Sequence, residues 1–228
     1  MDVLRRIVFA AAIAGLIAGG LTTVIHHFGT AALIAKSEVY EKAADASDGM
    51  ADMAHHAEAA VWEPEDGFER TAFTVVADVL TGIGFALLLG SAYSLHGGNV
   101  DWRKGLYWGL AGFATFTLAP SLGLPPEVPG TAAAPLLERQ IWWVVTAAMT
   151  AGGLALLFFG RRPVWVIAGV AALVLPHLYG APQPSEYKSA APESLAHQFV
   201  VVAVLTSLLF WLALGSLTGF FYRRLGRE

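Results

Sequence analysis

The sequence predicts an all-α membrane protein, built as a bundle of six transmembrane helices. Its 228 residues are 56% hydrophobic and only 14% charged, and the mean hydropathy is +0.57. A soluble domain averages about 25% charged and 45–50% apolar residues. The chain therefore lacks the polar surface of a water-soluble globule, and its length fits a single membrane domain over residues 1–228.

Six stretches that are almost free of charge supply the predicted spans. Each is at least as long as the roughly 20 residues that a helix needs to cross a ~30 Å hydrocarbon core. They cover residues 7–35, 71–95, 105–126, 140–160, 163–185 and 194–222. Their apolar residues are consecutive, whereas barrel strands alternate, so we expect helices. Pro176 lies inside the fifth stretch, and a bundle of five spans is the alternative.

The first stretch follows Arg5 and Arg6, as the core of a secretory signal would. Such a core has about 7–15 residues, and this stretch is nearly twice as long, so we expect a retained helix. The Ala-rich sequence that follows, up to residue 60, contains no proline. We expect it to continue the helix outside the membrane, with Gly49 weakening it and Pro64 ending it.

Basic residues predict the orientation of the bundle. With the N-terminus in the cytoplasm, every turn on that side carries a pair of basic residues next to a helix end, which is the positive-inside pattern. The basic residues on that side are Arg5, Arg6, Arg103, Lys104, Arg161, Arg162, Arg223, Arg224 and Arg227. We therefore expect both termini to be cytoplasmic.

Acidic residues gather on the opposite side, in one external segment over residues 36–70. Its acidic residues are Glu38, Glu41, Asp45, Asp48, Asp52, Glu58, Glu63, Glu65, Asp66 and Glu69. The net charge of −4 leaves no basic surface for nucleic acid. The expected surroundings of the chain are the lipid bilayer and, on the outside, cations.

Histidines favour a metal as that cation. Six of the seven lie at or beyond the outer face on this topology: His26, His27, His55, His56, His177 and His197. Imidazole nitrogen and carboxylate oxygen are ligands for Co²⁺, Ni²⁺ and Zn²⁺, and the lack of cysteine counts against a Cu⁺ site. These six histidines are therefore candidate metal ligands.

Within the external segment, Asp52, His55 and His56 are spaced so that they share one face of a helix. The carboxylates around them, with Glu38 and Glu41 as candidate pathway residues, would raise the local concentration of cations. This spacing predicts a capture site for a divalent metal. The alternative is a solvated, Ala-rich segment with two incidental histidines.

Asp78 is the one charged residue inside a predicted span. A carboxylate there costs ~2.5–3.5 kcal/mol and usually faces the protein interior or a water-filled cavity. Thr71, Thr74, Thr81 and Gly82 share its helical stripe. We expect Asp78 to line an ion or proton path, the alternative being a hydrogen bond to a neighbouring helix.

Other motifs indicate packing and not catalysis. Gly-x-x-x-Gly motifs that begin at Gly15, Gly105 and Gly215 allow close approach of helices. A proline-rich stretch over residues 118–130 carries Glu127, and it either lines the mouth of the pathway or is a stiff connector. No nucleotide-binding, hydrolase or metalloprotease motif is present, so we do not expect an enzyme.

Two groups of stretches have a distinctive sequence. The first comprises EVYE at 38–41, WEPEDGFERT at 62–71 and LTGIGFAL at 80–87, and the second comprises APSLGLPPEVPG at 119–130 and RQIWW at 139–143. They resemble the first and second halves of the CbtA family of probable cobalt transporter subunits. The resemblance implies a bacterial inner-membrane component that imports cobalt for cobalamin biosynthesis. It also implies a small partner, CbtB, with one span and a terminal histidine motif, and a family usually described with five spans.

The leading hypothesis is therefore uptake of Co²⁺, with no prosthetic group. The external segment gathers the ion, a site near His26, His27, His177 and His197 receives it, and Asp78 admits it. Ni²⁺ accepts the same ligands. Two alternatives stay open: a redox subunit whose haem is held by His26 or His27 with His177 or His197, and a metal sensor or scaffold without transport.

Overall fold

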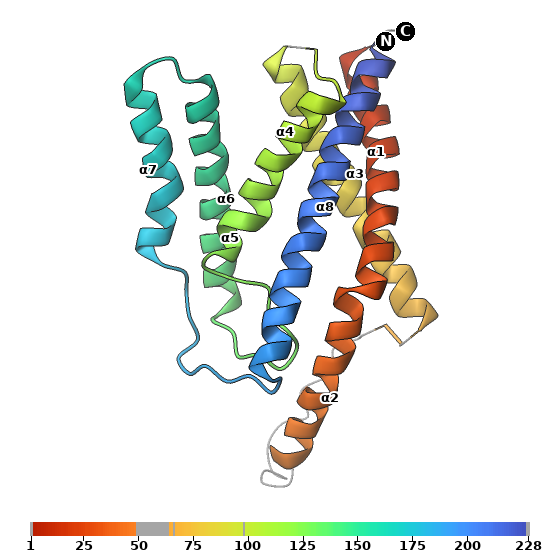
Figure 1. The fold of residues 1–228 in the computed structure, drawn as a ribbon, viewed down its shortest axis with the longest axis vertical. Coiled ribbons are helices and arrows are strands. Elements are labelled where there is room, and N and C mark those ends of the chain that lie inside the picture. The colour runs from red at the N-terminus through yellow and green to blue at the C-terminus, as the bar shows by residue number, and fades with distance from the viewer. Residues whose placement is uncertain (1, 49–63, 66, 98, 227–228) are drawn as a thin grey trace.

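The computed structural model describes residues 2–48, 64–65, 67–97 and 99–226, and these ranges contain helices and no strands (Figure 1). The helices are α1 (Val3–Phe28), α2 (Thr30–Asp48), α3 (Phe68–His96), α4 (Trp102–Phe113), the π-helical η1 (Ala114–Leu118), α5 (Ala119–Ser121), α6 (Leu136–Phe159), α7 (Pro163–Tyr179) and α8 (Glu193–Leu225). Within the described ranges, four helices are long and apolar enough to cross a membrane: α1, α3, α6 and α8. The all-α class is confirmed.

The remaining two predicted spans are also helical, but each departs from a simple long helix. The span over 105–126 is a helical stretch from Trp102 to Ser121 that is α-helical at first and then π-helical. The fifth, α7, has 17 residues and ends at Tyr179, short of residue 185. Gly180 follows with φ +89°, and the prolines at 182 and 184 cannot continue a helix.

The first predicted span bends where it leaves the bundle. α1 ends at Phe28, Gly29 adopts a non-helical conformation, and α2 then continues away from the other helices (Figure 1). The expected helical extension is therefore present as far as Asp48. The rest of that extension, with Gly49, Asp52, His55 and His56, lies outside the described residues.

Close helix contacts occur at the glycine motifs. A Cβ atom on Gly82 of α3 would lie 2.7 Å from the carbonyl oxygen of Gly15 on α1, and one on Gly215 of α8 would lie 2.7 Å from the Cα of Gly109 on α4. Such distances leave no room for a side chain. The expectation that these motifs serve packing is confirmed.

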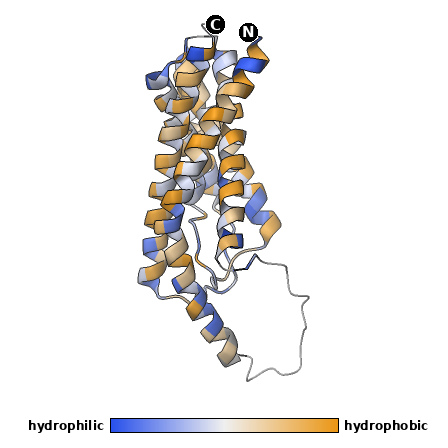
Figure 2. Ribbon diagram, turned by 90° about the vertical axis from the view of Figure 1, so that its right-hand side faces the viewer, coloured by the Kyte–Doolittle hydropathy of each residue, from blue (hydrophilic) through white to orange (hydrophobic). Residues whose placement is uncertain are grey.

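Hydropathy separates the middle of the bundle from its extremities. Apolar residues dominate the long helices, and polar residues are concentrated along α2 and at the end that holds the termini (Figure 2). Large apolar side chains such as Leu16, Val144 and Ile167 are 58 to 70% exposed on the flanks of the helices. Exposed side chains of this kind suit lipid contact.

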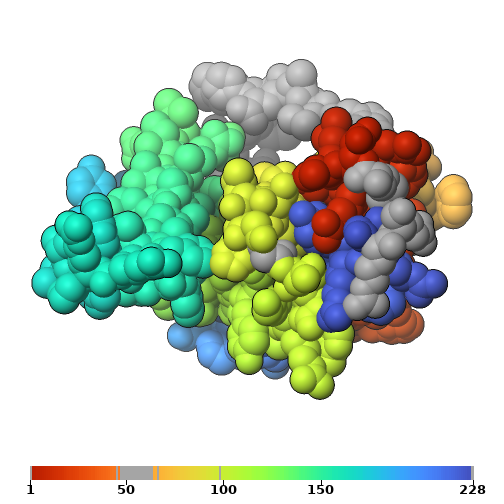
Figure 3. Space-filling model, turned by 90° about the horizontal axis from the view of Figure 1, so that it is seen from above, coloured from red at the N-terminus to blue at the C-terminus, as the bar shows by residue number. Residues whose placement is uncertain are grey.

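All four basic pairs expected on the cytoplasmic side lie at one end of the bundle, the end that holds both termini (Figures 1 and 3). There Arg6 donates to the backbone carbonyl of Tyr222 and lies 3.5 Å from the centre of its ring. Arg223 forms an ion pair with Asp101 at 3.2 Å. α1 and α8 are thereby joined at their ends.

Two loops close the opposite end. The hydroxyl of Ser37 on α2 donates to the carbonyl of Pro129 at 2.9 Å, which fixes the proline-rich loop against α2. The backbone N–H of Ala190 donates to the carbonyl of Gly130 at 3.0 Å, which joins this loop to the one before α8. An apolar cluster beneath them comprises Leu33, Val128, Ala191, Leu195 and Phe199.

Candidate functional site

A polar pocket of about 700 Å³ opens between α1, α3, η1 and α8. Its lining extends from the middle of the bundle to Gly67 and Ala35, at the end of the bundle from which α2 projects. Hydroxyl groups dominate the polar part of this lining. The polar residues are Thr22, Thr23, His26, His27, Thr30, Arg70, Thr71, Thr74, Asp78, Thr81, Thr117, Thr206 and Ser207.

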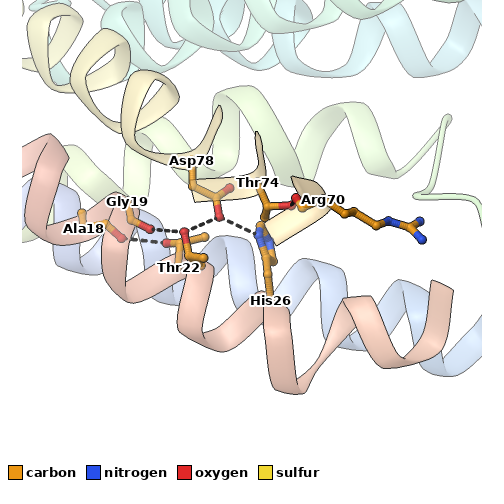
Figure 4. A network of polar contacts seen from close by, with 8 residues as sticks. Ala18, Gly19, Thr22, His26, Arg70, Thr74 and Asp78 are labelled. Atoms are coloured by element: carbon orange, nitrogen blue, oxygen red, sulfur yellow. Dashed lines mark hydrogen bonds and ion pairs between the residues drawn. The ribbon is translucent and has the colours of Figure 1, made fainter. Parts of the chain in front are cut away.

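Asp78 lies in this pocket with its side chain only 14% exposed (Figure 4). Its Oδ2 accepts a hydrogen bond from the hydroxyl of Thr23 at 2.9 Å and lies 3.1 Å from Nδ1 of His26. Both partners are on α1, whereas Asp78 is on α3. The carboxylate is therefore hydrogen-bonded to the neighbouring helix, which was one of the two interpretations made from the sequence, and it also lines a cavity.

The contact between Asp78 and His26 leaves the second ring nitrogen of His26 available in one tautomer. With Asp78 as a carboxylate, which can only accept, the donor in this contact is Nδ1 of His26. In the neutral imidazole, Nε2 then keeps its lone pair and is free to bind a metal. A histidine that donates one ring N–H to a carboxylate and binds a metal through the other nitrogen is the usual arrangement at metal sites.

The close contact of α1 with α3 brings these groups together. A Cβ on Gly19 would lie 2.7 Å from the backbone oxygen of Asp78, so the two backbones touch beside the site. Thr23 and His26 follow Gly19 on the same face of α1. The hydroxyl of Thr23 also lies 3.1 Å from the carbonyl of Gly19, which restricts its rotamer. The glycine motif thus positions the carboxylate against its partners.

Acidic residues at the rim are paired with arginines. Glu38 of α2 forms an ion pair with Arg70 of α3, close to the opening of the pocket. Glu127 in the proline-rich loop forms one with Arg139 at 3.2 Å. Glu41 lies near Gly130, since a Cβ on that glycine would be 3.2 Å from the Cβ of Glu41. The three candidate pathway carboxylates therefore lie on or near the structures that surround the end of the bundle opposite the termini.

The other predicted ligands are distributed more widely. His27 lines the same pocket as His26 and Asp78. His177 packs edge-on against Trp142, with ring centres 5.9 Å apart, and His197 is exposed near the start of α8; neither lines the pocket. The structure does not describe Asp52, His55 or His56. Within the described ranges, no three histidine, aspartate or glutamate side chains are grouped closely enough to hold a metal.

Several hydroxyl residues of the pocket were not singled out from the sequence. Thr23 binds Asp78 directly, and Thr117 on η1 and Ser207 on α8 contribute hydroxyls 2.6 Å apart. The sequence signal for such residues is a polar residue inside an apolar run. That signal does not show which face of the helix is directed toward the pocket. A threonine hydroxyl can also donate its hydrogen bond to a carbonyl of its own helix, without any contact to another helix.

The fold and this pocket define a multi-pass helical membrane protein with an ionisable pair held between two spans. The family described as "probable cobalt transporter subunit (CbtA)" matches residues 4–223, and the chain belongs to this family. The resemblance found in the sequence is thereby confirmed over nearly the whole chain. No curated protein and no solved structure matches the chain.

Proposed function

We propose that this protein imports Co²⁺ and that the ion passes through the pocket that holds Asp78 and His26. The observation that carries the proposal is the pairing of these two groups inside a membrane helix bundle, 3.1 Å apart, in a cavity rich in hydroxyls. Charged side chains within spans are rare and generally mark ion or substrate pathways. The family membership supplies the metal.

The pocket offers few strong ligands, which suits transit better than storage. His26 contributes Nε2, and threonine hydroxyls and water complete the coordination, while Asp78 orients the His26 ring and supplies negative charge beside the ion. An ion in a transport path must be bound well enough to enter and weakly enough to leave. Ni²⁺ would bind the same donors somewhat more tightly, so the choice of cobalt depends on supply and on other subunits.

Capture from outside is assigned to the acidic segment over residues 36–70. Asp52, His55 and His56 would concentrate the ion, and Glu38, Glu41 and Glu127 would guide it along the rim. His27 would receive it at the pocket, with His177 and His197 as further contacts at the outer end. The ion pair of Glu38 with Arg70 beside the opening supports a guiding role, since a cation can compete with Arg70 for the carboxylate.

The proposed topology has six spans, with α7 as the fifth and with both termini in the cytoplasm of a bacterial inner membrane. The location of four basic pairs at one end supports it. The family description names a subunit, so we propose a small one-span partner with terminal histidines, similar to CbtB. A haem role is not favoured, because His177 packs on Trp142 and neither His177 nor His197 lines the pocket that holds His26.

Uptake of radiolabelled cobalt into cells tests the proposal. Cells that express wild-type protein should accumulate more cobalt than cells without the gene, and Asp78→Asn should reduce accumulation to the level without the gene, because an amide supplies no negative charge to hold a cation in the pocket. Glu138→Gln is the matched control, since Glu138 is exposed on α6 and away from the pocket. Equal accumulation in wild-type and Asp78→Asn cells would overturn the proposed path.

A second variant separates transport from sensing. Deletion of residues 47–58 removes the proposed capture site. Under the transport proposal, cobalt uptake falls at low external concentration and recovers at high concentration, where capture is no longer limiting. A sensor without transport would show unchanged uptake and a changed downstream response.

A further inference from the structure

A second pocket lies on the other side of the bundle's middle. It measures about 470 Å³ and is lined mainly by apolar residues of α3, α4 and α6. Its lining includes His96 and Lys104, at the end of the bundle that carries the chain termini. The two pockets therefore extend from the middle of the molecule toward opposite ends, the polar one toward α2 and the apolar one toward the termini.

Three aromatic residues line both pockets: Phe85 on α3, Phe116 on η1 and Trp211 on α8. Each ring contacts the other two. The ring centres lie 5.0 Å apart for Phe85 and Phe116, 4.8 Å for Phe85 and Trp211, and 5.6 Å for Phe116 and Trp211, which are stacked. Trp211 is only 2% exposed. We call these three residues the ring barrier.

Residues on either side of Phe116 line different pockets. Thr115 lines only the apolar pocket, and Thr117 lines only the polar pocket. Phe116 lies between them in the π-helical segment η1. π-helical turns inside α-helices are rare and frequently occur at functional sites.

We propose that the ring barrier is the closed gate of the ion path, and that the structure is in a state open to the outside. This inference rests on the proposed function, because it takes the pocket of Asp78 as the outer half of the path. A hydrated cation cannot pass three contacting rings, and apolar constrictions close by excluding water. Opening requires at least one ring to move.

Phe116 is the ring that moves in this proposal. Trp211 cannot move toward α4, because its ring already packs closely against Gly112 of that helix. A Cβ on Gly112 would lie 2.8 Å from the Cη2 of Trp211 and nearer still to other atoms of the ring. Phe85 belongs to the regular helix α3. Conversion of η1 to regular α-helix would turn Phe116 and the two threonines around the helix axis. The outer pocket would then connect with the space that leads to His96.

Cysteine labelling tests the gate without any cobalt measurement. The chain has no cysteine, so each introduced thiol is unique. Thr117→Cys and Thr115→Cys place one thiol on each side of Phe116 at nearly constant volume. A positively charged, membrane-impermeant methanethiosulfonate reagent is then added outside intact cells. With the ring barrier present, we expect the Thr117→Cys protein to be labelled and the Thr115→Cys protein to remain at the background of the cysteine-free protein.

The second half of the experiment removes the ring. Phe116→Ala combined with Thr115→Cys should be labelled from outside at a rate approaching that of Thr117→Cys. Phe9→Ala is the matched control, because Phe9 lies on α1, 49% exposed and outside both pockets, and should leave Thr115→Cys unlabelled. Unchanged labelling of Thr117→Cys in the Phe116→Ala background establishes that the variant is folded.

The outcomes separate the gate from the transport proposal. Labelling of Thr115→Cys with all three rings present would overturn the gate, as would its protection in a folded Phe116→Ala protein. If the labelling pattern is as expected but Asp78→Asn leaves cobalt uptake unchanged, the barrier is real and the cobalt path lies elsewhere. That result would contradict the proposed function, but the conclusion that the ring barrier separates the two pockets would stand.

Discussion

At the scale of single residues, Asp78 is the feature on which the proposed function depends. The sequence identified it as a charge inside a span and predicted that it would face the protein or a cavity. Its partner Thr23 could not be foreseen, because the rotation of α1 relative to α3 is decided by contacts between distant parts of the chain. His26 was a candidate ligand, but its bond to Asp78 became visible only in the structure.

Loss of the Thr23 hydroxyl should weaken metal handling without removing a direct ligand. Thr23→Val leaves Asp78 with the contact to His26 and frees the carboxylate to rotate. Since such orienting groups typically change metal affinity 10–100-fold, we expect cobalt uptake at low concentration to fall about tenfold. Thr23→Ser should restore it.

Radiolabelled uptake as a function of cobalt concentration measures this effect. Ser91→Ala serves as the control, because Ser91 is on α3 and its hydroxyl bonds only to the carbonyl of Leu87. Wild-type uptake by the Thr23→Val protein across all concentrations would show that the hydroxyl has no part in the path.

Asp101 gives a pH-dependent contribution to stability. The backbone N–H of Lys104 donates to this carboxylate and lowers the pKa of Asp101, and Arg223 lowers it further. Because the pKa is lower in the folded state, the stabilisation is present above the ordinary pKa of aspartate and is lost as the pH falls through the lowered value. Wild-type protein in detergent should therefore melt at a higher temperature than Asp101→Asn at neutral pH. The difference should vanish in strong acid, and a constant difference would contradict the assignment.

At the scale of helices, small residues determine which faces meet. The sequence predicted close packing at three Gly-x-x-x-Gly motifs, and the structure confirms it. The sequence did not predict which helices would pair, because a Gly-x-x-x-Gly motif can pack against any other helix that has small residues at the contact. Two local features also escaped prediction, the bend at Gly29 and the π-helical η1, since both depend on contacts with other elements and not on hydropathy.

Substitution of Gly82 should disrupt the contact of α1 with α3. Gly82→Val would place side-chain atoms against the backbone of Gly15, and overpacking of this kind costs about 1–3 kcal/mol. Gly84→Val is a close control, because Gly84 is on the same helix and has open space around its Cβ position. Unfolding by increasing sodium dodecyl sulfate, followed by circular dichroism, measures the free energy of unfolding. Equal loss of stability in both variants would contradict the packing argument.

At the scale of the whole molecule, hydropathy predicted the helical membrane class well, because lipid imposes long apolar helices on any chain that crosses it. The length of α7 was less predictable. Its 17 residues span about 26 Å at 1.5 Å per residue, slightly less than the hydrocarbon core. Gly180 and the prolines after it set the end of this helix, and their effect on its exact length depends on the loop that follows.

Reporter insertions test the six-span topology. Alkaline phosphatase is active only outside the cytoplasm, so we expect activity for an insertion after Tyr187 and none for an insertion after Arg161. Green fluorescent protein fused to the C-terminus should fluoresce. Absence of phosphatase activity after Tyr187, together with loss of fluorescence at the C-terminus, would show that α7 does not cross the membrane and would favour five spans. Phosphatase activity after Arg161 would contradict the proposed orientation of the spans before α7.

The junction of α1 with α8 also bears on how this protein is made. α1 packs against α8, which leaves the ribosome after α3, α4, α6 and α7, and Arg6 bonds to the backbone of Tyr222. During synthesis, the face of α1 that contacts α8 must therefore wait in the membrane until α8 has been translated. Chains that stop before α8 would expose this helix surface without its partner, which is a feature that membrane proteases could recognise.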